Sequence, residues 1–258
     1  MIIRFANCLD AHGIAVLVGS GFKDEISGAM IYGADGIETY LKSQLSIASN
    51  INDSVYIVAE DVNTIIGFVE FRNGFDYLFL NFIGISSLSQ NKGVAKKLLR
   101  QAVVMASSIN HRRISLDVFD DNEIAKSWYI NLGFTPEYIT NWYRIKQTVK
   151  CTDFIAKVSG YSQSQICYSS FGFSQFTVNT IADTYSVGLL GNKWFRVSQP
   201  EILNDVDALA CLNSIDPNRY ILGLFRVDIH QNLPSNGVLF CSSIRMSLDI
   251  ESFEKNIS

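Results

Sequence analysis

The segment that most constrains the fold is the loop over residues 90–95, which reads QNKGVA. It lies between an apolar run over 77–85 and a helix-like stretch over 94–105. The first turn of a helix has backbone N–H groups without intrahelical acceptors and carries the positive end of the helix dipole. Gly93 allows close approach to the backbone, and Lys92 adds a positive charge. This order predicts a phosphate-binding loop, although a glycine-started helix that only packs on a sheet has the same pattern.

A second pattern follows further along the chain. Residues 113–118 alternate between apolar and polar side chains, which predicts a half-buried strand. Asp121 or Asn122 can cap the helix that comes next, and Gly133 can end it. The apolar and aromatic residues of this helix recur at spacings of three and four, so they share one side of it. They are Ala125, Trp128, Tyr129 and Leu132.

Together the two segments resemble the GCN5-related N-acetyltransferase (GNAT) superfamily. The acetyl-CoA loop of that family reads Gln/Arg-x-x-Gly-x-Gly/Ala, a pattern filled here by Gln90, Gly93 and Ala95. Its second segment has Asn, Ala, Tyr and Gly-Phe at the spacing found here in Asn122, Ala125, Tyr129, Gly133 and Phe134. The resemblance covers about residues 1–147. It implies an α/β (α+β) fold of the GNAT acyl-CoA-binding type, with a mixed, mostly antiparallel sheet flanked by helices.

The expected elements of this region follow from periodicity and turn residues. We expect a strand over 1–8, two helices within 20–49, and a hairpin of strands 55–60 and 64–72. A strand over 77–85, a helix over 93–109, a strand over 113–119, a helix over 122–132 and strands over 134–138 and 140–147 complete the expectation. We expect an acetyltransferase domain over residues 1–150, in which the early helices form one wall of the acceptor site.

Residues 151–258 carry the signals of a smaller C-terminal α/β domain. We expect strands over 171–178, 185–190, 193–197, 219–227 and 244–250, and a helix over 200–213. A degenerate second copy of the first fold is one interpretation. A second phosphate loop is absent from its sequence, so the expected role is shaping the acceptor site or forming a dimer contact.

Composition narrows the class of protein. The chain has 258 residues, of which 48% are hydrophobic and 18% charged, and this is enough for two small folded domains. A net charge of −4 argues against general binding of nucleic acid or anionic membranes, which needs a basic face. The sequence shows neither a secretory signal nor an apolar stretch long enough to span a membrane. We therefore expect a cytoplasmic protein.

The cysteines are scattered, odd in number and without metal-ligand spacing: Cys8, Cys151, Cys167, Cys211 and Cys241. No C-x-x-C or His/Cys cluster suggests zinc, so we expect no metal site. The simplest interpretation is a set of buried free thiols in a reducing compartment.

The resemblance also implies how acetyl-CoA, the cosubstrate, is held. The fourth strand splays from its neighbour near its end, and there its peptide groups pair with the pantetheine. The diphosphate rests on backbone amides of the loop, and Asn122 contacts the pantetheine, although a helix cap explains that residue equally well. The implied coenzyme-binding residues are Ile83, Gly84, Ile85, Gln90, Asn91, Lys92, Gly93, Val94, Ala95, Lys96, Asn122 and Tyr129.

Acetyl transfer to an amine needs a group that protonates the leaving thiolate and a group that takes the amine proton. In the family the first role belongs to the tyrosine matched by Tyr129, whose phenol is protonated at neutral pH; the alternative is a core tyrosine. Some members place a glutamate early in the fourth strand, but this chain has Phe79 there. Glu70 is the best substitute as general base, unless it is a glutamate that points to solvent. The weaker candidates are Asp76, Asn81 and Asp117.

The sequence therefore predicts an acetyl-CoA-dependent N-acetyltransferase in which a primary amine attacks directly. The acceptor class stays open between a small molecule and a peptide or protein amine, and the acidic balance favours a cationic small molecule. A non-catalytic acyl-CoA-binding or regulatory protein is the alternative from a different class. A homodimer is compatible with the extra domain.

Overall fold

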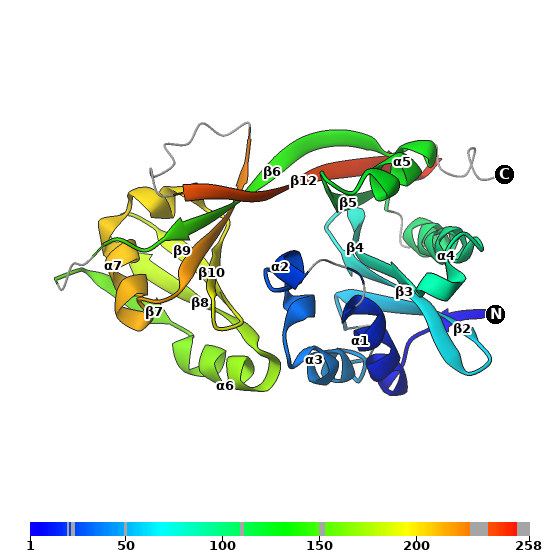
Figure 1. Cartoon of the computed structure of the whole chain (residues 1–258), viewed down its shortest axis with the longest axis horizontal. Coiled ribbons are helices and arrows are strands. Elements are labelled where there is room, and N and C mark those ends of the chain that lie inside the picture. Colours follow the sequence, from blue (N-terminus) through cyan, green and yellow to red (C-terminus); the bar gives the residue numbers. More distant parts are fainter. Residues whose placement is uncertain are drawn as a thin grey trace. The chain divides into compact units, whose positions relative to one another are not determined.

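The computed structural model describes residues 1–19, 21, 24–48, 51–108, 111–149, 153–227 and 237–251. The chain divides into two compact units, which Figure 1 shows with labelled elements. Unit 1 consists of residues 1–22, 38–137 and 244–258, and unit 2 of residues 23–37 and 138–243. The boundary expected at residue 150 lies outside the described residues. The units do not follow chain order, because each takes in a stretch that is remote in sequence.

Unit 1 is a sheet covered by helices. Its strands lie in the order β1-β2-β3-β4-β5, followed by parts of β12 and β6. The elements are β1 (Ile2–Phe5), η1 (Cys8–Asp10), α1 (Ala11–Gly19), α3 (Ile37–Gln44), β2 (Ser54–Asp61), β3 (Thr64–Asn73), β4 (Tyr77–Ile85), η3 (Ser87–Ser89), α4 (Val94–Ser108), β5 (Arg113–Phe119), α5 (Glu123–Asn131), β6 (Thr135–Lys146) and β12 (Gly237–Asp249). The β1–β4 pairs are antiparallel and β4 pairs with β5 in parallel, so the expected mixed, mostly antiparallel sheet is confirmed.

Alternation along β3 separates two faces of this sheet. Val69 and Phe71 enter the main hydrophobic core, which also takes Leu98 and Leu99 from α4. Glu70 and Arg72 point to the opposite face, where α1 packs against the sheet. The two faces therefore have different chemistry: one is an apolar core beneath α4, and the other contains ionisable groups.

The C-terminal strand belongs to the sheet of unit 1. Residues 244–249 of β12 lie between β5 and β6, and Met246, Leu248 and Ile250 are buried in the core of unit 1. The Arg245 guanidinium donates two hydrogen bonds to the Asp117 carboxylate, at 2.6 and 3.0 Å. A segment from the end of the sequence thus completes the sheet that the first residues begin.

Unit 2 repeats the same kinds of element. They are α2 (Asp24–Ser27), η2 (Ile31–Gly33), the remainder of β6 and β12, β7 (Ala156–Ser159), α6 (Tyr161–Phe171), β8 (Phe173–Thr180), β9 (Thr184–Leu190), β10 (Trp194–Val197), η4 (Pro200–Asn204), α7 (Val206–Ile215) and β11 (Tyr220–Arg226). Its strands follow the order β6-β11-β10-β9-β8-β7. The β10–η4–α7–β11 segment has the topology of β4–η3–α4–β5, because β10 and β11 are parallel partners joined through a helix.

Several expected elements have different limits in the structure. Helix α1 was not expected, since Gly13 and the β-branched residues around it are poor helix formers. A Cβ at Gly13 would lie 3.0 Å from the Ile65 side chain, so glycine lets α1 approach β3 closely. Residues 135–146 form one strand rather than two, and the expected first strand ends at Phe5.

In unit 2 the expected helix over 200–213 is interrupted. A 3₁₀ turn ends at Asn204, and Asp205 then caps α7 by accepting a hydrogen bond from the Ala208 amide at 3.0 Å. Helix α6 occupies residues 161–171, so the strand expected from 171 begins at Phe173. Helical propensity is weak in α6, whose polar residues give little amphipathic pattern, and tertiary packing decides its structure.

The expectation of buried thiols is wrong for Cys167, which is exposed, whereas Cys211 is buried. Cys8 and Cys241 are half-buried, and none of these four cysteines forms a disulfide within the described part of the chain; Cys151 lies outside the described residues. None of the described helices combines the length and the apolar character that crossing a membrane requires.

Candidate functional site

The end of β4 separates from β5. The two strands pair from Tyr77 with Arg113 to Leu80 with Leu116, although β4 continues to Ile85 and β5 to Phe119. On its other side β4 stays paired with β3 up to Ile85. Residues 81–85 therefore present one edge of peptide groups that is not used by β5, and this is the splay that the family resemblance implies.

The loop after β4 has the backbone geometry expected of a ligand cradle. Asn91 and Gly93 both have positive φ, at 60° and 74°. A Cβ built on Gly93 meets no atom within 4 Å, so the space above this residue is open. Gly93 accepts the first helical hydrogen bond from the Lys97 amide at 3.1 Å. The amides of Val94, Ala95 and Lys96 thus lie in the first turn of α4, where the helix itself supplies no acceptor.

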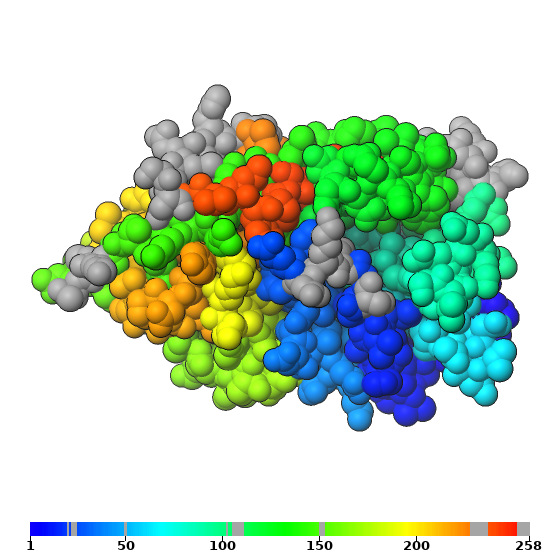
Figure 2. Space-filling view, in the orientation of Figure 1, coloured from blue at the N-terminus to red at the C-terminus, as the bar shows by residue number. Residues whose placement is uncertain are grey.

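The charge around this helix start favours an anion. The first turn of α4 contains no acidic residue. Lys92, Lys96 and Lys97 are exposed, and within the described chain no carboxylate lies within ion-pair distance of their ammonium groups. Figure 2 shows that the segment around residues 90–100 lies at the molecular surface, where solutes reach it. The residues present therefore fit a diphosphate in both geometry and charge.

Helix α5 is positioned by its two ends. The Asn122 side chain accepts a hydrogen bond from the Ala125 amide at 3.1 Å, so Asn122 is the helix cap. Gly133 has φ of 97° and ends the helix, as expected. The capping role explains Asn122 without a ligand, and its role toward a coenzyme stays a prediction.

Tyr129 lies in the core of unit 1, with 6% of its surface exposed. Its ring packs edge-on against Phe134 at 5.4 Å and is tilted against Trp128 at 4.9 Å. Burial raises the pKa of Tyr129, because the phenolate would lose its hydration. The phenol is therefore protonated at neutral pH, which is the state that a proton donor needs.

Glu70 is buried, with none of its surface exposed, so the interpretation of a solvent-facing glutamate is wrong. Its Oε1 accepts a hydrogen bond from Arg72 Nε at 3.0 Å, while its Oε2 has no hydrogen-bond partner in the described part of the chain. Burial raises the pKa of Glu70, and Arg72 and Asn81 lower it to a smaller extent. A buried carboxylate with a free oxygen and a raised pKa has the properties of a general base.

Sequence reasoning missed the surroundings of Glu70. Tyr56 is its direct neighbour on β2, and Phe82 is its neighbour on β4, so Glu70 lies beside the splayed part of β4. The register between β3 and β4 shifts after this pair, and Asn81 is the extra residue of the resulting β-bulge. The bulge brings Asn81 to Glu70. Neither the bulge nor the cross-strand pairing has a local sequence signal.

The other candidates for the general base lose support. Asp76 is exposed in the turn between β3 and β4, and Asp117 is held by the Arg245 guanidinium. Phe79 pairs with Ser115 of β5, below the splay, and the same Arg245 stacks over its ring at 4.8 Å. Among the candidates, Glu70 alone combines burial with a position next to the open edge of β4.

The helix start in unit 2 that corresponds to the start of α4 is occupied by a carboxylate of the chain itself. Helix α7 begins at the cap residue Asp205, whose carboxylate also accepts hydrogen bonds from Thr180 Oγ1 and Tyr185 Oη at 2.6 and 3.1 Å. Strand β10 pairs with β11 along its whole length, from Trp194 to Val197. The helix start is thus filled by a carboxylate, and the strands do not splay. This agrees with the absence of a second phosphate loop in the sequence.

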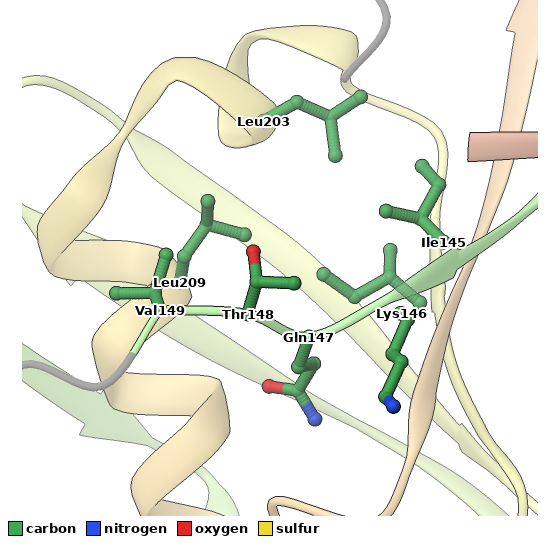
Figure 3. A pocket seen from close by; sticks show the side chains of 8 residues that line it. Ile145, Lys146, Gln147, Thr148, Val149, Leu203 and Leu209 are labelled. Carbon is green, nitrogen blue, oxygen red and sulfur yellow. The ribbon is translucent and has the colours of Figure 1, made fainter. Parts of the chain in front are cut away.

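Unit 2 contains a small cavity, whose lining side chains are drawn in Figure 3. Its volume is about 40 Å³ and its walls are mostly apolar, with Ile145, Leu203, Leu209 and Ile221 among them. A space of this size holds a water molecule rather than a substrate. The cavity therefore does not compete with the face around Glu70 as a site of chemistry.

Comparisons with known proteins agree with this geometry. Residues 29–134 match the Acetyltransferase (GNAT) family. The 5-NmdU N-acetyltransferase of Pseudomonas phage PaMx11 is 41% identical over 56 residues, which are 22% of this chain and only 38% of that relative. The match thus spans well under half of the relative's length.

Two solved structures are similar over 96% of this chain. A tandem GNAT protein from the clavulanic acid biosynthesis pathway, covered over 98% of its length, has a TM-score of 0.65 and 9% identity. A GCN5-related N-acetyltransferase from Sphaerobacter thermophilus, covered over 95%, has a TM-score of 0.61 and 12% identity. At these identities the likeness establishes the fold, and it confirms that the GNAT-like fold extends into the C-terminal half. Residues 29–134 are thus similar to the GNAT acetyltransferase family, and the fold and the loop after β4 agree with that match.

Proposed function

We propose that the protein is an acetyl-CoA-dependent N-acetyltransferase that moves the acetyl group to a primary amine of a small molecule or peptide. The observation that carries this proposal is the open edge of β4 at residues 81–85 next to the glycine-started helix α4. One feature suits a thioester arm and the other suits a diphosphate. Both lie in unit 1, which also contains the buried Glu70.

In this proposal the coenzyme is held mainly by backbone. The peptide groups of Ile83, Gly84 and Ile85 pair with the pantetheine amides, and the amides from Asn91 to Lys96 bind the diphosphate. Glycine at position 93 is required because its φ is positive and because a side chain would fill the open space above the loop. The exposed lysines near the helix start add attraction for the phosphates.

The chemistry needs two proton transfers by residues of this chain. Glu70 accepts a proton from the acceptor ammonium, directly or through water, and the neutral nitrogen forms the new amide bond by direct attack. Bound acetyl-CoA supplies the reactive thioester, whose carbon–sulfur bond breaks. Tyr129 donates its phenolic proton to the leaving thiolate, and the second proton that the acceptor nitrogen loses as the amide forms restores the phenol through water. The raised pKa of Tyr129 keeps its phenol protonated, and the raised pKa of Glu70 makes its carboxylate, once ionised, a stronger base.

A non-catalytic acyl-CoA-binding protein is the second candidate. It is favoured by Phe79, which stands where some family members have a glutamate. The two candidates differ in one measurement, because only the enzyme releases free CoA thiol when an amine is added to the acetyl-CoA complex. A protein amine as acceptor is distinguished from a small amine by the same assay with peptides.

The test of coenzyme binding is Gly93→Glu. A carboxylate at this position meets the diphosphate and fills the open space, so calorimetric titration with acetyl-CoA should show loss of binding by at least about 100-fold, equivalent to roughly 2.7 kcal/mol. Wild type should bind one acetyl-CoA per chain, because the corresponding helix start of unit 2 is occupied by Asp205.

The matched control is Gly160→Glu. Gly160 also caps a helix, has φ of 72° and meets no atom within 4 Å of an added Cβ, but it lies in unit 2. It therefore carries the same backbone strain without the proposed ligand. Equal affinity of Gly93→Glu and wild type would remove the basis of the proposal, and equal loss in both variants would reduce it to a folding effect.

A further inference from the structure

The ion pair between Glu70 and Arg72 uses only part of each group. Arg72 donates to Glu70 through Nε alone, at 3.0 Å, although arginine and carboxylate commonly form two parallel hydrogen bonds. Oε2 of Glu70 is left without a hydrogen-bond partner among the described residues, and the Nη atoms of Arg72 take no part in the hydrogen bond between the two groups, which uses Nε and Oε1. The pair thus keeps an unpaired acceptor on Glu70 beside a guanidinium that bonds to Glu70 through Nε.

The two groups differ in their access to solvent. Glu70 is completely buried, whereas 41% of the Arg72 side chain is exposed. Arg72 is therefore the part of this cluster that a solute meets first. Its guanidinium is planar and fixed at Nε, so its remaining N–H groups are oriented before any ligand arrives.

Tyrosines surround this pair and contribute no full charge of their own. Tyr56 is opposite Glu70 on β2, is 4% exposed, and has a buried hydroxyl without a hydrogen-bond partner in the described residues. Tyr40 of α3 is half-buried and lies close enough to Arg72 for the positive charge of the guanidinium to act on its hydroxyl group. The face thus contains polar atoms that folding has desolvated but not satisfied. Such atoms are costly unless a ligand or water pairs with them.

We propose that Arg72 binds an oxyanion of the acceptor, so that the acceptor is a primary amine that also carries a carboxylate or phosphate group. This inference rests on the proposed function, in which Glu70 takes the amine proton. The amine would meet Oε2 of Glu70, and the oxyanion would meet the Nη atoms of Arg72. The site would then favour zwitterionic acceptors over simple cationic amines.

The experiment uses two pairs of probes that differ by the oxyanion. One pair is γ-aminobutyrate and butylamine, and the other is O-phosphoethanolamine and ethanolamine. Binding of each probe to the full-length protein saturated with CoA is measured by calorimetry, for wild type, Arg72→Gln and Arg72→Lys. The control is Lys42→Gln, which removes an exposed charge from α3, the helix that carries Tyr40.

In wild type we expect the oxyanion-bearing member of at least one pair to bind about tenfold or more tightly than its simple cationic partner, as for a hydrogen bond to a charged group. Arg72→Gln should bring this ratio near one, Arg72→Lys should retain part of it, and Lys42→Gln should leave it unchanged. A change in Glu70 caused by the Arg72 substitution affects both members of a pair alike, because both carry the same amine. The ratio of their affinities therefore reports on the oxyanion alone. The pair that shows the preference identifies carboxylate or phosphate.

A ratio near one in wild type, an unchanged ratio in Arg72→Gln, or no binding of any probe would overturn the inference. The proposed function is judged separately, from CoA thiol release with amines that lack the oxyanion and from acetyl-CoA binding by Gly93→Glu. Turnover of butylamine without any preference for the anionic probes would reject the role of Arg72 and leave the acetyltransferase proposal standing. Absence of coenzyme binding in wild type would reject both.

Discussion

At the residue scale, the decisive feature is a carboxylate that folding has removed from water. Glu70 is enclosed on a central strand, and one Arg72 contact only partly offsets the cost of ionising it. An exposed glutamate would be a poor base for an ammonium because its pKa is far too low. Burial narrows this gap by raising the pKa of Glu70.

Glu70→Gln should lower kcat/KM by about 100- to 10,000-fold, the usual effect of losing a general base. Wild-type kcat/KM should rise with pH as Glu70 loses its proton, and this limb should lie above the ordinary glutamate pKa of about 4.3. The variant should lack the limb. Steady-state thiol release between pH 5 and 9 measures both effects, and an unchanged profile would assign the base to another group.

The same substitution has an expected effect on stability. The pKa of Glu70 is raised in the folded state, so its favourable contribution is complete below the unfolded pKa and is lost as pH rises through the folded pKa. Glu70→Gln should therefore be more stable than wild type at pH 8, with a smaller difference at pH 4. Urea unfolding at both pH values tests this sign independently of activity.

Tyr129→Phe should lower turnover by roughly 10- to 1,000-fold while acetyl-CoA affinity stays within about twofold, because it removes a proton donor and keeps the packed ring. Tyr185→Phe is the control, since it removes a buried hydroxyl from unit 2, where Tyr185 bonds to Asp205. Normal turnover in Tyr129→Phe would mean that water or another group protonates the thiolate and that Tyr129 is a core residue.

At the element scale, the site depends on where strands stop pairing. Strand β4 has the same bounds in the structure as in the sequence pattern, but its pairing with β5 ends at Leu80. The bulge at Asn81 begins at this point, so the irregularity and the splay are adjacent. An apolar run predicts the strand well. It contains no information on which partner accompanies each residue.

Strand β12 gives a prediction at this scale. Leu248 is 2% exposed in the core of unit 1, so Leu248→Ala should destabilise that unit by about 2–5 kcal/mol. The apparent affinity for acetyl-CoA should fall in proportion to the fraction of the variant that is unfolded. Leu239→Ala on the same strand is the control, because Leu239 is 54% exposed and its loss should change stability by less than about 0.5 kcal/mol. Thermal unfolding with and without acetyl-CoA measures both variants. Equal stability of the two variants would contradict the assignment of β12 to unit 1.

At the scale of the whole molecule, two units of similar topology have diverged at one helix start. Unit 1 has Gly93 there, which is open, and unit 2 has Asp205, which neutralises the helix start with its own carboxylate. Helix dipoles favour one anion at this position, and a side chain in unit 2 already provides it. The proposed chemistry therefore belongs to unit 1 alone.

Features that depend on neighbours along the chain follow from local sequence. The loop at 90–95, the hairpin turn near Asn63 and the end of α5 at Gly133 each rest on backbone conformations that particular residues adopt, and all are present. The bounds of β4 and β5 follow from short apolar periods and agree with the structure. Local physics is sufficient for these features, because a turn or cap is decided within a few residues.

Features that depend on partners remote in sequence arise only when the chain packs. The burial of Glu70, the position of Asn81 in a bulge and the unpaired Oε2 of Glu70 result from the packing of β2, β3 and β4. Residues 244–249 of β12 lie between β5 and β6, two strands that are more than 90 residues earlier in the chain. An alternating apolar pattern shows which face of a strand is buried, but it does not name the strand beside it. For that reason the backbone geometry of the loop over residues 90–95 was predictable from sequence, whereas the surroundings of Glu70 were not.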